Sequence, residues 1–149
     1  MCLYIDESVH GSAYSKQKAF IAQTDIVVWK FLDKRYDYRD GKYHYHAPYR
    51  GTEYKLGDLN ESALEKEWDK VHKGLHCFAS HRKARSEKEI FGSTSSVFCG
   101  IIPKGSQVYV GICKELVSNQ LIVYKSKKDL EAVHGEIQPA ITKDIALAT

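Results

Sequence analysis

The stretch that decides the fold is residues 97–112, VFCGIIPKGSQVYVGI. Apolar residues crowd its first half, and Val108 and Val110 alternate with other side chains in its second half. This pattern is typical of a buried strand followed by a strand with one solvated face. We therefore predict that the stretch forms a hairpin, with its turn at Pro103-Lys104-Gly105-Ser106.

A hairpin of two strands is only marginally stable in water, so further strands must pair with it. The other β-rich runs are residues 24–32, 43–56, 75–79 and 121–125. The first run is apolar on both faces, with Lys30 on the same face as Ile26 and Val28, which is typical of an interior strand. Asp40-Gly41 then predicts a tight turn into the second run.

Three stretches carry helix signals. Residues 60–71 have a capping box at Ser62 and Glu65 and an apolar stripe at helical spacing. Residues 81–89 predict a strongly basic helix, and a third short helix is predicted to start at Ser126 and end at Gly135. These elements predict an α+β fold, a mainly antiparallel sheet of five to seven strands with two or three short helices.

The chain has 149 residues, about the size of one domain. We expect a single domain with a loose N-terminal arm at residues 1–18 and a partly ordered tail at residues 136–149. Its net charge is +3, from 22 basic and 19 acidic residues, and this mixed surface argues against binding extended duplex nucleic acid.

Cysteine usage and the absence of long apolar runs bear on location. The four cysteines lie far apart without a CxxC motif, and residues 1–17 lack the apolar core of a secretory signal. We therefore expect reduced thiols in a cytoplasm. No apolar run approaches the length needed to cross a bilayer, so we expect no membrane partner.

Aromatic and cationic side chains gather at residues 43–50. A site for a nucleotide-like ligand needs aromatic planes for the base and cations for the phosphate. The turn after residue 102 adds a cation and backbone donors. The ligand-binding residues that we predict are Tyr43, Tyr45, Tyr49, Arg50, Lys104 and Ser106. The alternative is that the tyrosines simply pack, half exposed, on an edge strand.

Histidines and cysteines offer metal ligands, but zinc needs three or four that converge. The candidates are His44 and His46 on one strand face, and His72, His76, Cys77 and His81 close together in sequence. Spacing alone does not bring these groups together, so we expect ordinary histidines, no metal and no cofactor. Cys77 and Cys99 lie in apolar strand runs, where a buried thiol acts as a small hydrophobe.

Tyr49-Arg50-Gly51, followed by Ser93-Thr94-Ser95 and a late strand, resembles the arrangement of the ADP-ribosyltransferases. The resemblance implies that Arg50 and either Thr94 or Ser95 position a dinucleotide. The late strand reads Ser118-Asn119-Gln120-Leu121 and lacks the glutamate of that family, whose charge is central to the chemistry. An enzyme of this kind, or an inactive remnant of one, is therefore one hypothesis.

A wider resemblance covers about two thirds of the chain. The matching motifs are MCLY at residues 1–4, TDIVV at 24–28, PYRG at 48–51 with Tyr54 and Gly57, GLH at 74–76 with Phe78, IIPKGS at 101–106, and SN with LIV at 118–123. They resemble a family of small, mostly uncharacterised bacteriophage and prophage proteins.

The resemblance implies a phage accessory protein in the host cytoplasm, a setting that includes anti-defence factors sequestering signalling nucleotides. Our leading hypothesis is a non-catalytic binder of a small anionic or nucleotide-like ligand, with a homo-oligomer as one arrangement. A structural or host-protein-binding role is a further hypothesis.

Overall fold

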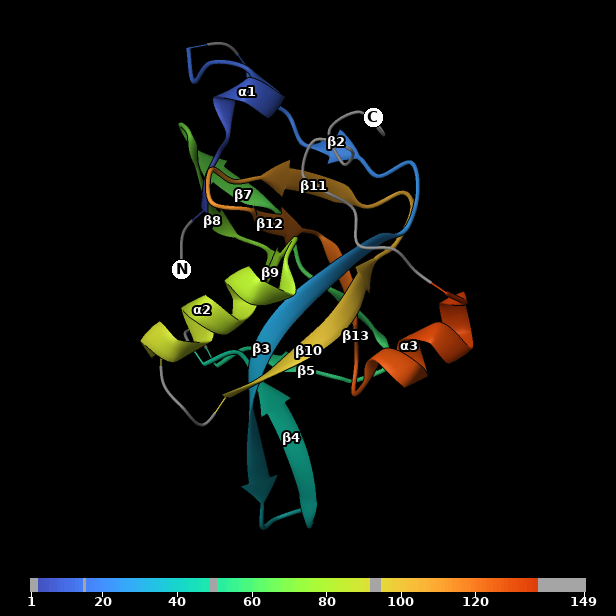
Figure 1. The fold of residues 1–149 in the computed structure, drawn as a ribbon. Coiled ribbons are helices and arrows are strands. Elements are labelled where there is room, and N and C mark those ends of the chain that lie inside the picture. Colours follow the sequence, from blue (N-terminus) through green and yellow to red (C-terminus); the bar gives the residue numbers. More distant parts are fainter. Residues whose placement is uncertain (1–2, 15, 49–50, 92–94, 137–149) are drawn as a thin grey trace.

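A computed structural model describes residues 3–14, 16–48, 51–91 and 95–136 (Figure 1). These residues form an antiparallel sheet of ten strands, a second sheet of three strands, and three helices. The predicted α+β class, with a mainly antiparallel sheet, is therefore confirmed, whereas five to seven strands is too few. No helix in the described part of the chain is long and apolar enough to cross a membrane.

The elements follow one another along the chain. The strands are β1 (Leu3–Tyr4), β2 (Phe20–Ile21), β3 (Ile26–Asp37), β4 (Lys42–His46), β5 (Glu53–Tyr54), β6 (Leu59–Glu61), β7 (Glu65–Glu67), β8 (Lys70–Lys73), β9 (Leu75–Phe78), β10 (Ser95–Ile102), β11 (Gln107–Val110), β12 (Glu115–Ser118) and β13 (Gln120–Tyr124). The helices are α1 (Glu7–His10), α2 (His81–Phe91) and α3 (Lys127–His134).

The centre of the large sheet is the antiparallel pair of β3 and β10. Eight residue pairs join them, from Ser95 opposite Asp33 to Ile102 opposite Ile26. The two strands run side by side through the middle of the molecule; α2 lies against both of them, and α3 lies against β10 and β13 (Figure 1). The prediction that β3 is an interior strand is confirmed, because apolar residues on both of its faces are buried.

The predicted hairpin at residues 97–112 is wrong. β10 pairs with β3 and β13, whereas β11 pairs with β2 and β12, so the two strands are not neighbours. Ile102 faces Ile26 and Val108 faces Phe20. The six-residue step from 102 to 108 therefore matches the six-residue step from 26 back to 20, so the register does not change. β10 and β11 are therefore two halves of one bent strand, which follows the bent strand formed by β2 and β3.

Hydrogen bonds at the bend explain why residues 103–106 do not reverse the chain. The Gly105 N–H donates to the Ala22 carbonyl, and the Ala22 N–H donates to the Ser106 carbonyl. The Lys104 N–H donates to the Asp25 carboxylate at 2.9 Å. These bonds continue the pairing between the β2–β3 segment and the β10–β11 segment around the bend.

The large sheet closes on itself. β11 pairs with β12, β12 pairs with β9, and β9 pairs with β3 through Phe78 and Trp29. Because β3 also pairs with β10, which continues into β11, these pairings form a complete cycle around a buried interior. The β3–β4 hairpin, which turns at the predicted Asp40-Gly41, projects beyond this cycle (Figure 1).

The helix predicted for residues 60–71 is also wrong, because these residues form parts of β6, β7 and β8 and the segments that connect them. Val71, expected on the apolar stripe of that helix, is fully buried in β8, opposite Leu3. Trp68 lies in the turn between β7 and β8 with a φ of 57°. Pairing with β1 and β13 has overridden the helical periodicity, since tertiary contacts outweigh weak local propensities.

The two other predicted helices are confirmed. α3 begins after Ser126, whose hydroxyl accepts a bond from the Asp129 N–H, and ends before Gly135. α2 covers the predicted basic stretch and buries Ala84 against Phe31 and Phe78.

The segment expected to be a loose arm contains β1 and α1. Leu3 and Ile5 are buried in a cluster with Val71, Tyr109 and Val117. The tail expected at residues 136–149 lies outside the described residues, except for Glu136.

Gly100 provides a test of the central pairing, because it lies in β10 between Val28 and Val123. A Cβ at this position would meet the Ile122 carbonyl oxygen at 2.7 Å. We expect Gly100→Ala to lower the free energy of unfolding by about 1–3 kcal/mol in urea denaturation, because the backbones must separate. Ser96→Ala, at an exposed position of β10, should change it by less than about 0.5 kcal/mol. Equal stability of the two variants would contradict the tight pairing.

Candidate functional site

Lys30 lies on the face of β3 that packs in the hydrophobic core. Ile26, Val28 and Leu32 point to the same face of β3 and belong to the main hydrophobic cluster. Lys30 lies among them with only 8% of its surface exposed. Lysine is almost never this deeply buried without a partner.

The Lys30 ammonium has few polar neighbours. It donates a hydrogen bond to the His76 carbonyl at 2.5 Å and lies 4.7 Å from the centre of the Tyr54 ring. In the described part of the chain, no carboxylate forms an ion pair with it. Burial lowers the pKa of Lys30 to about 8, and the neighbouring Cys77 opposes this shift.

A cavity of about 80 Å³ lies beside this ammonium. Its wall comes from β3, β5, β9 and β12 and from the described residues between β4 and β5. The described lining residues are Lys30, Phe31, Ala47, Pro48, Thr52, Tyr54, Gly74, His76, Cys77, Phe78 and Glu115. Most of the wall is therefore aromatic, aliphatic or backbone, with one buried cation, as is typical of sites for small ligands.

Cys77, Tyr54 and Glu115, which also line the cavity, stay uncharged more readily than in water. Burial raises the pKa of the Cys77 thiol to about 12 and also raises the pKa of Tyr54. The pKa of Glu115 is raised by burial and by the nearby Glu87 carboxylate. Cys77 is therefore a protonated thiol at neutral pH, as expected from its sequence, and a poor nucleophile.

Two of the predicted ligand residues, Tyr43 and Tyr45, lie on β4. The Tyr43 ring is 56% exposed, 5.1 Å from the Tyr36 ring, with the Lys34 ammonium 4.2 Å from its centre. Tyr45 is half-buried and pairs with Tyr54, so its strand borders the cavity. Tyr43 thus offers an open aromatic surface, whereas Tyr45 contributes to packing.

Lys104 and Ser106 lie at the other end of β3. The Lys104 N–H donates to Asp25, just before β3 begins. Tyr45 pairs with Lys34, near the far end of β3. The strand between Asp25 and Lys34 spans about 30 Å, so the structure does not bring these two groups together. Ser106 is fully buried, and its hydroxyl donates to Gln120. Tyr49 and Arg50 lie outside the described residues.

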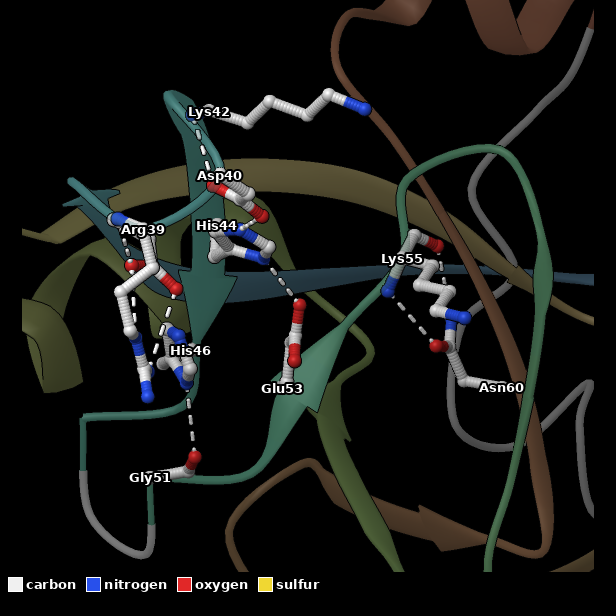
Figure 2. Close-up of polar contacts among 10 residues, drawn as sticks. Arg39, Asp40, Lys42, His44, His46, Gly51, Glu53, Lys55 and Asn60 are labelled. Carbon is white, nitrogen blue, oxygen red and sulfur yellow. Dashed lines mark hydrogen bonds and ion pairs between the residues drawn. The ribbon is translucent and has the colours of Figure 1, made fainter.

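A second polar cluster lies on the β3–β4 hairpin (Figure 2). His44 Nδ1 is 2.6 Å from a Glu53 carboxylate oxygen, and His44 Nε2 is 2.6 Å from an Asp40 carboxylate oxygen. Both nitrogens donate only in the protonated imidazolium. The two hydrogen bonds, with Glu53 the stronger influence, raise the pKa of His44. The imidazolium therefore joins β4, β5 and the hairpin turn.

The described residues contain one group spaced for a metal ion, formed by Asp37, Asp40 and His44. Its ligand atoms lie within 4.8 Å of one another. His44 can offer a nitrogen to a metal only after losing a proton that both of its hydrogen bonds favour. The group is thus better suited to holding a proton. His72, His76, Cys77 and His81 do not form such a cluster.

The residues of the transferase resemblance are dispersed or undescribed. Arg50 and Thr94 lie outside the described residues. Ser95 is buried, and its hydroxyl donates to the Asp33 carboxylate at 2.7 Å. Asn119 and Gln120, from the late strand, line a separate shallow hollow.

Lys30 is the residue that sequence reasoning missed as a site. The available signal was its position, because a lysine on the core-facing side of an interior strand must either reach solvent or be buried. The predicted face of Lys30 is confirmed, since Ile26 and Val28 on that face are buried.

Comparisons with known proteins do not identify the chain. No protein-family model matches it, and no curated protein or solved structure matches it. The geometry and chemistry of the cavity are therefore the basis for assigning a function.

The buried ammonium gives a pH-dependent prediction. Because the pKa of Lys30 is about 8 in the folded protein and 10.5 in its ordinary state, the unfolded chain binds more protons between these values. The free energy of unfolding of the wild type should therefore rise by about 3 kcal/mol relative to Lys30→Met as the pH increases through this window. Urea denaturation of both proteins from pH 7 to pH 10.5 measures the difference, in which the other titrations cancel. A constant or falling difference would contradict the burial of a charged Lys30.

The His44 cluster gives a second prediction, measured by the NMR titration of the imidazole. The pKa of His44 should lie above its usual value in the wild type and fall in Glu53→Gln, because the neutral amide no longer favours the imidazolium. Glu61→Gln, a carboxylate outside this cluster, should leave it unchanged. The stabilisation by Glu53 should be fully present below the usual histidine pKa and disappear as the pH rises through the raised pKa. A His44 pKa at the usual histidine value in the wild type would contradict the two hydrogen bonds from His44 to Asp40 and Glu53.

Proposed function

We propose that this protein binds a small anionic ligand in the cavity beside Lys30 and releases it unchanged. The observation that carries the proposal is a buried ammonium, at the wall of a cavity, with no ion-pair partner in the described part of the chain. A buried charge without a counter-charge is costly. An anion in the cavity would supply that counter-charge. Removing the unfavourable free energy of the unpaired buried charge would then favour binding of the anion.

The hydrogen-bonding capacity of Lys30 supports this role. An ammonium has three N–H donors, and the described contacts are one carbonyl and one aromatic face. A donor therefore remains for a ligand oxygen. The apolar walls, from residues such as Phe31 and Phe78, would exclude water and strengthen the charge interaction.

The release of an unchanged ligand is supported by the chemistry around the cavity. The Cys77 thiol remains protonated, because burial raises its pKa to about 12. The late strand of the chain carries Gln120, an amide, where a transferase of the resembling type carries an acid. We therefore favour binding over catalysis at this site.

The biological setting follows from the phage and prophage resemblance and is part of the proposal. In the cytoplasm of a host, a protein that holds a small anion would withhold it from host proteins, as an anti-defence factor does. A nucleotide could instead stack on Tyr43, a ligand residue predicted from the sequence, which the structure places beside Lys34. This surface is open and 56% of Tyr43 is exposed, so we place it second to the cavity beside Lys30.

Two lysines on one face of β3 allow a matched test. Thermal denaturation would be followed with added inorganic phosphate, AMP and short-chain carboxylates, one at a time. A bound anion at ten times its Kd should raise the melting temperature of the wild type by about 3–6 °C. Lys30→Met should abolish this rise, whereas Lys34→Met, on the exposed part of the strand, should retain it.

The pattern of loss separates the candidate functions. A response to AMP that is lost in Lys34→Met but kept in Lys30→Met would replace the cavity with the Tyr43 surface. Transfer of ADP-ribose from NAD to host proteins, abolished by Arg50→Ala, would favour the enzyme hypothesis. No response to any anion, together with tight binding of one host protein, would favour a role in protein binding.

A further inference from the structure

The charges that line the cavity beside Lys30 bear on the class of ligand. Among the described lining residues, Lys30 is the only lysine or arginine and Glu115 is the only carboxylic acid. Lys83 lies near Glu115 and lowers its pKa, although burial and Glu87 raise it. The described wall therefore offers one positive charge that makes no described ion pair, and it carries one carboxyl group.

The single cationic side chain of the described wall matches a monoanion. A phosphate monoester carries close to two negative charges at neutral pH, so one of them would remain buried without a partner. Phosphate sites also commonly use several backbone N–H groups, a helix N-terminus or an arginine fork. The described wall residues lie on strands and loops, and no helix contributes to them.

The size and surface of the cavity narrow the class further. Its volume of about 80 Å³ is smaller than the ~150 Å³ of an engineered apolar cavity that holds benzene. A nucleotide would not fit inside it, whereas a carboxylate with a few carbon atoms would. Phe31, Phe78, Ala47 and Pro48 present apolar surface to such a tail.

We infer that the cavity binds a small monocarboxylate with a short apolar tail. The carboxylate pairs with the Lys30 ammonium, and the tail contacts Phe31 and Phe78. This inference rests on the proposed function, because it names the ligand class of the same site. It replaces the nucleotide-like ligand expected from the sequence with a smaller and singly charged one.

The protonation of Lys30 makes binding depend on pH. With a pKa of about 8, most of the free protein carries the charged ammonium at pH 7 and little of it does at pH 9. The affinity for a carboxylate should therefore fall by about tenfold between these values. A neutral ligand should show no such dependence on Lys30.

The test uses four probes of defined charge: butyrate, butyramide, inorganic phosphate and AMP. Binding is measured by NMR chemical-shift titration and calorimetry at constant ionic strength, with wild type, Lys30→Met and Lys34→Met. We expect saturable binding of butyrate to the wild type and to Lys34→Met, and at least a tenfold weaker interaction with Lys30→Met. Butyramide, which has the same shape without the charge, should bind at least tenfold more weakly than butyrate.

The outcomes distinguish this inference from the proposed function. Binding of phosphate or AMP that requires Lys30, without binding of butyrate, would overturn the monocarboxylate and leave the anion site intact. Failure of all four probes to show Lys30-dependent binding would overturn both. The butyramide comparison and the pH dependence use the wild type alone, so they remain informative if Lys30→Met does not fold. Equal affinity for butyrate and butyramide would also overturn the inference.

Discussion

The antiparallel pairing of β3 with β10 is the constraint on which the rest of the structure depends. It joins eight residue pairs and continues around the bend at residues 103–106 without a change of register. Since the register is kept, each half of one bent strand must pair with the matching half of the other. Strands β9 and β12 then connect the two halves and close the sheet, which gives the chain a buried interior without a large helical layer.

This closure explains the state of Lys30. On an open sheet, a lysine in the middle of a strand can extend its stem over the surface and keep its ammonium in water. In this closed sheet, β9 and β5 lie between the Lys30 side chain and water. The described contacts of the ammonium are the His76 carbonyl and the Tyr54 ring. The same pairings that build the core therefore create a buried charge beside a cavity. A stability cost of this kind is often retained at sites where a protein binds a ligand.

The β3–β4 hairpin extends the central strand beyond the closed sheet and separates two kinds of chemistry. Lys34, Tyr36 and Tyr43 share one face, where the rings contact each other and the ammonium lies over one of them. His44 lies on the opposite face, between the carboxylates of Asp40 and Glu53. Alternation of side chains along paired strands produces this division, because neighbouring residues point to opposite sides. The imidazolium also ties β5, and with it Tyr54, to the hairpin.

The sequence by itself determined the local features: the interior strand with Lys30 on its core-facing side, the Asp40-Gly41 turn, and α3 from its Ser126 cap to Gly135. These depend on side-chain period, turn chemistry and caps, which act over a few residues. Only the tertiary structure decided that residues 97–112 bend instead of reversing, because Ala22 and Asp25 capture the backbone of the bend. It also placed three strands and their connections where the sequence predicts a helix at residues 60–71, and it left Lys30 without an ion pair to any described carboxylate. Pairing partners and counter-charges come from distant parts of the chain, which no local pattern records.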